Sequence, residues 1–307
     1  MSLHTGCNLA KEETVATQPT HIDSVVDAPD FDFEKDGGTR RAREFPYWFV
    51  ALILIAIFAT YTILSKDNYR EAFEFIYIGI QITIRTSLIA YGFALLLGLL
   101  TGLARISGSV VLNNIARLYV ELIRGIPMLV LIFFIALVGV PIIIDLLNSM
   151  GVWISSLGME RIGGLFSAFT NQGIPMNVRA IVALSVTYGA FLAEIFRAGI
   201  QSIGRGQMEA ARSVGMGYAQ AMRYVILPQA VRNVLPALGN DFVAMVKDSS
   251  LVSVLAVRDI TQVARLYAGS TFRFREAYVT LSTMYLTMTV VLSLLVQALE
   301  RRMRRHE

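Results

Sequence analysis

The stretch EAARSVGMGYAQAMRYVILP, residues 209–228, interrupts an otherwise apolar chain with charge, alanine and glycine, and it ends at a proline. In the whole chain of 307 residues, hydrophobic residues make up 55% and charged residues only 16%, and the mean hydropathy is +0.57. A soluble domain carries more charge on its surface than this. The composition therefore predicts a membrane protein in which this stretch lies outside the bilayer.

Six apolar segments are long enough to cross a bilayer as helices, because a hydrocarbon core of roughly 30 Å takes about 20 helical residues to cross. In the second segment, Gly98 and Gly102 form a Gly-x-x-x-Gly step, which predicts close packing against another helix, within the chain or across a dimer. The sequence thus predicts an all-α integral membrane protein with six transmembrane helices, at residues 45–65, 78–104, 118–144, 178–198, 234–257 and 278–299.

Arginine and lysine gather in cytoplasmic loops of membrane proteins. They precede the first segment, follow the last and recur in residues 202–233, so we expect both termini and this loop to be cytoplasmic. In this topology four arginines lie on the extracytoplasmic side, so the distribution of basic residues supports it only in part. Residues 141–177 lie outside in this topology, and we expect a short interfacial helix at about 145–157. The four exceptions are Arg258, Arg265, Arg273 and Arg275.

Residues 1–44 form a polar, acidic segment with few large apolar side chains. Such a segment cannot bury enough surface to offset chain entropy, so we predict a disordered cytoplasmic tail.

The three histidines, His4, His21 and His306, lie near the ends of the chain, and neither they nor the single Cys7 form a metal-ligand pattern. We therefore expect neither a metal site nor a catalytic site. Basic residues adjoin apolar runs instead of forming a stripe, so we expect no nucleic-acid partner.

The loop at residues 202–233 is too polar to cross the bilayer but has helical character. Residues 209–212 are good helix formers, residues 214–217 can break the helix, and residues 218–226 can start another. The sequence predicts a helix, a turn and a second helix along the membrane face. On composition alone, an ordinary hydrated surface loop is an equally good interpretation.

The loop resembles the cytoplasmic signature of permeases from binding-protein-dependent ABC transporters. That signature is Glu-Ala-Ala, three residues, Gly, nine residues, Ile, one residue and Leu-Pro; here Val225 replaces the Ile. The flanking stretches YVELIRGIPMLVLIFF (119–134), TYGAFLAEIFRAGI (187–200) and VKDSSLVSVLAV (246–257) resemble the polar amino acid branch, which includes permeases for histidine, glutamine, glutamate and arginine. The matching positions are Glu209, Ala210, Ala211, Gly215, Leu227 and Pro228.

The resemblance covers residues 78–302 and implies a type I ABC importer fold, with residues 45–65 as an extra helix. It also implies partners: ATP-hydrolysing subunits that dock on the loop, a second permease chain, identical or not, an extracytoplasmic binding protein that delivers a polar amino acid, and the surrounding membrane lipid. Glu209 suits the first turn of a helix or a cationic partner, and Gly215 allows a turn with positive φ. No phosphate-binding lysine motif is present, so we expect no cofactor or enzymatic activity in this chain, and ATP and Mg to bind the partner ATPase.

Charged residues inside a membrane helix are costly and usually have a partner or line a pathway. Glu121 and Arg124 in the third segment, and Glu194 and Arg197 in the fourth, are each three apart and therefore neighbours on a helix face. Thr187 lies on the same stripe as Glu194. These groups either form ion pairs that hold the helices together, within one helix or between two, or line a gate or polar path for a zwitterion.

The fifth segment has a polar stripe that includes Asn240, Lys247 and Asp248, with Ser249 and Ser250 beside it. Charges of both signs suit an α-amino acid. An equally good alternative is an aqueous rim where the helix is broken.

A second functional hypothesis is a secondary transporter driven by an ion gradient through Glu121, Glu194 or Asp248. Such folds usually contain inverted repeats, and the sequence has no visible one. An intramembrane enzyme is a third possibility, but no catalytic constellation supports it.

Overall fold

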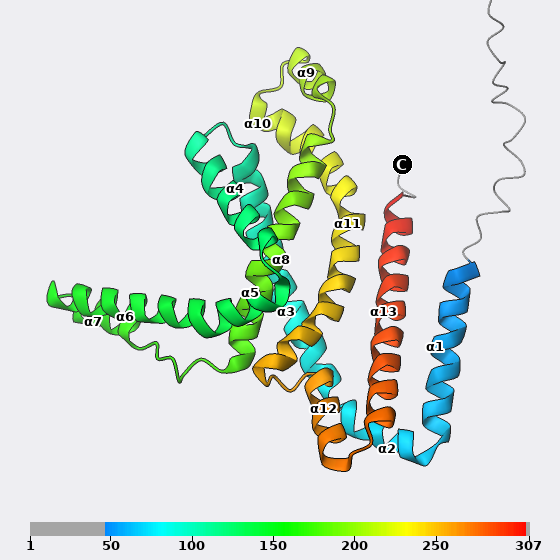
Figure 1. Ribbon diagram of the computed structural model, residues 1–307. Helices are drawn as coiled ribbons and strands as arrows, with labels where there is room; N and C mark the ends of the chain where they lie inside the picture. Colours follow the sequence, from blue (N-terminus) through cyan, green and yellow to red (C-terminus); the bar gives the residue numbers. More distant parts are fainter. Residues whose placement is uncertain (1–46, 305–307) are drawn as a thin grey trace, which may run out of the picture. The chain divides into compact units, whose positions relative to one another are not determined.

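The computed structural model describes residues 47–304, and every regular element in that range is a helix (Figure 1). The predicted disordered tail, Cys7 and the three histidines lie outside the described residues.

Three helices match predicted spans: α3 (Gly79–Ile106), α8 (Met176–Gln201) and α13 (Phe274–Arg304). Together with residues Met128–Ser156, they are the four described stretches that are long and apolar enough to cross a membrane. The first predicted span is α1 (Tyr47–Ser65), which continues after a bend of 105° into α2 (Asp67–Ile76). This bent pair would be a fifth crossing if it counts as one span.

The third predicted span, 118–144, is wrong as a single helix. α4 (Val110–Gly125) ends before Pro127, and a second helical stretch follows as α5 (Met128–Phe134), the π-helical η1 (Ile135–Gly139) and α6 (Val140–Ser156). Ile126 is extended, with φ −110° and ψ 138°. A residue before proline is pushed out of the helical region, so Pro127 breaks the helix instead of bending it.

The interfacial helix predicted at 145–157 is the second half of α6, not a separate element. A short helix that the sequence did not predict, α7 (Glu160–Ser167), packs against it. The two backbones approach closely at Gly151, where a Cβ would lie 2.7 Å from the carbonyl oxygen of Gly163.

The fifth predicted span, 234–257, is also wrong as a continuous helix. α11 (Leu227–Asp248) starts earlier, with Pro228 in its first turn, and a 3-10 segment, η3 (Ser249–Leu255), follows it. The Ser249 hydroxyl donates to the Val246 carbonyl at 2.8 Å, a local bond that competes with the helical pattern. The chain then turns through Ala256, at φ 57°, into α12 (Ile260–Thr271), which the sequence did not predict.

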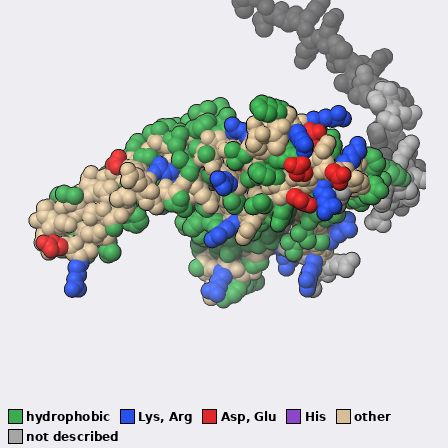
Figure 2. Space-filling view, turned by 90° about the horizontal axis from the view of Figure 1, so that it is seen from below, with side chains coloured by type: hydrophobic (Ala, Val, Ile, Leu, Met, Phe, Trp, Pro, Cys, Tyr) green, Lys and Arg blue, Asp and Glu red, His purple; other side chains and the backbone are tan. Residues whose placement is uncertain are grey.

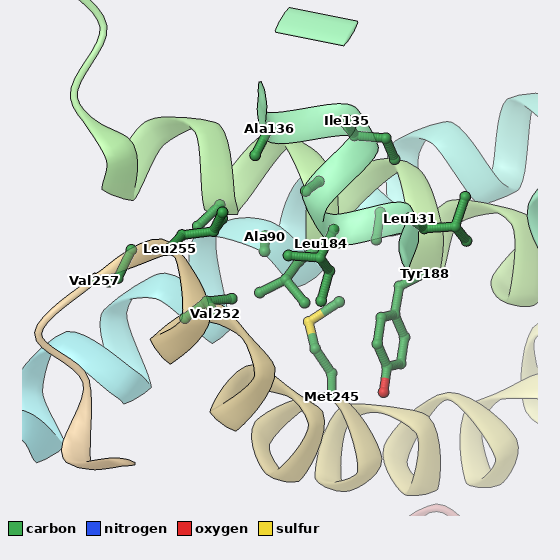
Figure 3. Packing of buried hydrophobic residues seen from close by; sticks show 14 of the residues in the cluster. Ala90, Leu131, Ile135, Ala136, Leu184, Tyr188, Met245, Val252, Leu255 and Val257 are labelled. Carbon is green, nitrogen blue, oxygen red and sulfur yellow. The ribbon is translucent and has the colours of Figure 1, made fainter. Parts of the chain in front are cut away.

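The core is built around α3 and α8, which run parallel and in close contact. A Cβ at Gly98 would lie 2.6 Å from the Leu192 Cβ, and one at Gly102 would lie 2.9 Å from the Phe196 Cβ. The predicted close packing is thus confirmed, and it occurs within the chain. Met245 of α11 points toward Leu184 in this core, as Figure 3 shows.

The end formed by α2 and α12 is seen in Figure 2, where acidic and basic side chains gather among apolar ones. Arg273 Nη1 lies 2.7 Å from Glu71 Oε2, and Arg70 Nε lies 3.0 Å from Glu74 Oε1. Arg273 is one of the four arginines that oppose the charge rule, and its pairing with Glu71 offsets that excess charge.

Candidate coupling loop and polar pathway

The loop after α8 forms the predicted helix, turn and second helix. It consists of α9 (Arg205–Ser213), α10 (Tyr218–Ala221) and the π-helical η2 (Met222–Ile226), which leads directly into α11. Gly215 has φ +88°, a conformation that glycine adopts without steric cost. At the base of the loop, Asn233 Nδ2 donates to Ser202 Oγ at 3.0 Å.

The signature residues of this loop are mostly open to solvent. Glu209, Ala210, Leu227 and Pro228 are exposed, whereas Ala211 is buried. Glu209 is the fifth of nine residues in α9, so its expected place in the first turn is wrong. The alternative, a cationic partner, stays a prediction.

Three large side chains next to the signature are also exposed, and sequence reasoning gave them no role: Val214 at 75%, Tyr224 at 65% and Tyr218 at 64%. An apolar residue placed between polar ones in a loop is the signal that could have identified them. With Glu209 and Ala210 they give this end of the molecule a mixed surface on which another protein could dock.

A cluster of ion pairs joins α3 to α8 near the loop. The Glu194 carboxylate accepts hydrogen bonds from Arg105 of α3 and from Arg197, whose guanidinium also donates to Gln201. Arg197 Nε lies 3.1 Å from Glu194 Oε1. The predicted Glu194–Arg197 pair is therefore formed. Sequence reasoning missed Arg105, because only the register between α3 and α8 brings it to Glu194.

Glu121 and Arg124 are both exposed on α4, and no ion pair between them occurs in the described part of the chain. The Arg124 guanidinium carbon instead lies 5.9 Å from the centre of the Phe191 ring. Such a contact between a cation and an aromatic face is favourable. The interpretation of two matching intrahelical ion pairs is thus wrong for α4.

The polar stripe of α11 divides into an open and a partly covered part. Asn240 and Lys247 are exposed, whereas Asp248 is half-buried and accepts a hydrogen bond from the Tyr188 hydroxyl at 2.7 Å. Tyr188 is 4% exposed, and Figure 3 shows its ring reaching toward α11. Sequence reasoning missed this tyrosine, since no local pattern links residues 60 apart.

Three further candidates differ in access. Ser249 is fully buried, and its hydroxyl already donates to a backbone carbonyl. Thr187 is also fully buried, and its hydroxyl has no partner among the described residues. Ser250 is half-buried beside them. Among the candidates on α11 and η3, Asn240 and Lys247 are therefore exposed, and Asp248 and Ser250 are partly accessible.

The described residues contain no group of three histidine, cysteine, aspartate or glutamate side chains that could hold a metal ion. The arrangement offers one exposed loop and one polar helix face.

Comparison with known proteins assigns the chain to a family. Residues 94–305 match the model of the binding-protein-dependent transport system inner membrane component. The chain belongs to this family. It is 38% identical over 237 residues to the probable glutamine ABC transporter permease protein GlnM of Bacillus subtilis (strain 168), covering 77% of this chain and 95% of that one. It is 32% identical over 226 residues to the glutamine transport system permease protein GlnP of Escherichia coli (strain K12), covering 74% and 91%.

A solved structure, "Crystal structure of an amino acid ABC transporter with histidines", is 36% identical to this inner membrane component, with a TM-score of 0.61 over 78% of this chain and 97% of that one. As a family member the chain is a multi-pass permease subunit of an ABC transporter in the bacterial inner membrane. This result favours the ABC permease over a secondary transporter. The family match begins inside α3, so α1 and α2 precede it.

Proposed function

We propose that this permease imports polar amino acids that an extracytoplasmic binding protein delivers, and that separate ATPase subunits drive the movement. The cargo follows from the relatives, two of which are named as glutamine permeases, and from the solved neighbour, which is titled an amino acid transporter. The observation that carries the mechanism is the α9–α10 loop, an exposed helical element that carries the family signature.

Coupling requires a surface that another protein can push. The exposed Glu209 and Ala210 supply a charge and a small contact, while buried Ala211 anchors α9. Because α10 continues through η2 into α11, a force on the loop is transmitted directly to the helix that carries Lys247 and Asp248. ATP and Mg bind the partner subunits in this proposal, and this chain performs no covalent chemistry.

The proposed topology has six crossings with both termini cytoplasmic. The crossings are α1, α3, the α4 to α6 stretch, α8, α11 and α13. The end of α13 and the α9 loop lie toward the same end of the helices in Figure 1, which supports this topology for the C-terminus. The segment between α6 and α8 would then face the binding protein.

The polar pathway would run along α8 and α11 and be completed by a second permease chain. Asn240, Lys247 and Asp248 are its candidate contacts, with Ser250 at its edge. Glu194 and Arg197 would form its cytoplasmic gate, with Glu121 and Arg124 on the adjoining α4. Thr187 and Ser249 would support the wall from inside, since both are buried.

The test is ATP-dependent uptake into liposomes that contain the permease, its ATPase and binding protein. Glu209→Lys should reduce uptake at least tenfold without changing membrane insertion. Glu74→Lys is a matched control, because Glu74 is also exposed but lies on α2, outside the loop and the proposed pathway. Normal uptake by Glu209→Lys would reject the coupling role, and uptake that survives ATP depletion but collapses with an uncoupler would favour an ion-gradient mechanism.

A further inference from the structure

Helix α1 and helix α13 enclose a slot that protein does not fill. The slot is a cavity of about 360 Å³ lined on one side by Ala56 and Thr60, and on the other by Thr287 and Leu294. A second cavity of about 230 Å³ continues it and shares Thr60 and Thr287. A guest in an apolar space of this size between two membrane helices would be favourable, because an empty gap loses dispersion contacts on both walls.

The chemistry of the slot favours hydrocarbon over water. The Thr60 hydroxyl is already bonded to the Ala56 carbonyl at 2.8 Å. The Thr287 hydroxyl is buried and unbonded within the described residues, and it is the only hydroxyl left to face a guest in the larger cavity. A buried water needs two to four polar partners, so one hydroxyl cannot hold it. An acyl chain needs none.

The end of α13 supplies a charge for a headgroup. Thr287, Leu294 and Arg301 are seven residues apart and therefore lie on one stripe of the helix. At 1.5 Å per residue, Arg301 stands about 21 Å beyond Thr287, which is roughly the length of a lipid acyl chain. Arg301 and Arg302 are exposed. The neighbouring Glu300 lines a different cavity, between α3, α11 and α13.

We propose that an anionic phospholipid binds between α1 and α13, with an acyl chain in the slot and its phosphate on Arg301 and Arg302. The lipid fastens α1, which precedes the family match, to the last helix of the transport domain. Charge complementarity with the two arginines selects a phosphate from the leaflet at this end of α13.

Native mass spectrometry of the full chain can test this proposal, with phosphatidylglycerol and phosphatidylcholine offered in equal amounts. Wild-type protein should retain phosphatidylglycerol preferentially. Val291→Trp fills the slot and should lower retention at least tenfold, whereas Leu295→Trp, on the same helix but outside both cavities, should not. Each basic residue near a membrane surface contributes about 1 kcal/mol toward anionic lipid, so Arg301→Gln with Arg302→Gln should reduce the preference about 25-fold.

Arg275→Gln, at the opposite end of α13, is the charge control and should leave the preference unchanged. Equal retention of the two lipids by wild-type protein would overturn the headgroup assignment. Equal losses in Val291→Trp and Leu295→Trp would mean that ordinary surrounding lipid is being measured. A lipid-free dimer that Val291→Trp dissociates would assign the slot to a second copy. If Val291→Trp does not fold, the arginine pair, which lies at the exposed helix end, still decides the outcome.

Discussion

At the two ends of α8, arginine side chains are held in different ways. Near the start of the helix, Arg179 is 9% exposed and donates to the backbone carbonyls of Ile174, at 3.2 Å, and Ala136, at 3.3 Å. Near the other end, Arg105 and Arg197 pair with the Glu194 side chain, which is 28% exposed.

The contacts of Arg179 are fixed, whereas the contacts of Glu194 can be exchanged. Backbone carbonyls cannot change partners unless the chain moves, so Arg179 ties η1 and the segment before α8 to one geometry. A carboxylate shared by two guanidinium groups can release one and keep the other. The releasable contact lies at the end of α8 that leads into α9, where an importer must move. We expect substitutions at the fixed end to affect folding and those at the other end to affect transport.

Replacement of Arg179 should have the largest effect on stability. Arg179→Met removes a buried charge and leaves its carbonyl partners, including Asn171, without a donor. We expect a loss of about 3–5 kcal/mol in the free energy of unfolding, measured by denaturant titration in detergent. Arg179→Lys should recover only part of it, because one ammonium group cannot reach all the carbonyls. A stable Arg179→Met protein would show that the Arg179 hydrogen bonds are not needed to hold this end of α8 in place.

Asp259 should make the stability of the protein depend on pH. It lies before α12, is 1% exposed, and its carboxylate accepts from Gln262 N at 2.8 Å. Burial raises the pKa of Asp259 to about 6. The unfolded value is about 3.9, so stability should fall as pH rises from about 4 to 6, by up to roughly 3 kcal/mol, and this contribution should then stay constant. Asp259→Asn keeps the helix cap and should remove this slope in thermal unfolding against pH. An unchanged slope would assign the dependence to another group.

Loss of the Glu194 carboxylate should cost less, because the cluster is partly solvated. Glu194→Gln should lower stability by about 1–2 kcal/mol, and a double-mutant cycle with Arg105→Gln should give a coupling above about 0.5 kcal/mol. Uptake should change more than stability does if the contact opens during transport. A coupling of zero would mean that α3 and α8 are held by packing alone.

The sequence predicted the features that depend on residues close together in the chain, but not the contacts between residues far apart in it. α3, α8 and α13 and the turn at Gly215 follow from patterns within one segment, and the structure contains them. The sequence predicted one helix through Pro127 at residues 118–144, and the hydrophobic pattern could not say that Ile126 would become extended. The partners of Glu194 and Asp248, Arg105 and Tyr188, come from other helices, and only the tertiary register identifies them.

The smallest expected effect on stability is at the loop itself, where the comparison between folding and transport is sharpest. Gly215 has φ +88°, so Gly215→Ala should cost about 1–2 kcal/mol locally, because a Cβ disfavours the left-handed region. Gly204 is a matched control: it is also exposed, caps the start of α9, and has φ −58°, which alanine tolerates. Because α9 is exposed and adds little to the core, Gly215→Ala should leave global unfolding almost unchanged but reduce ATP-dependent uptake, whereas Gly204→Ala should transport normally. Equal uptake by the two variants would show that the shape of this turn does not matter for coupling.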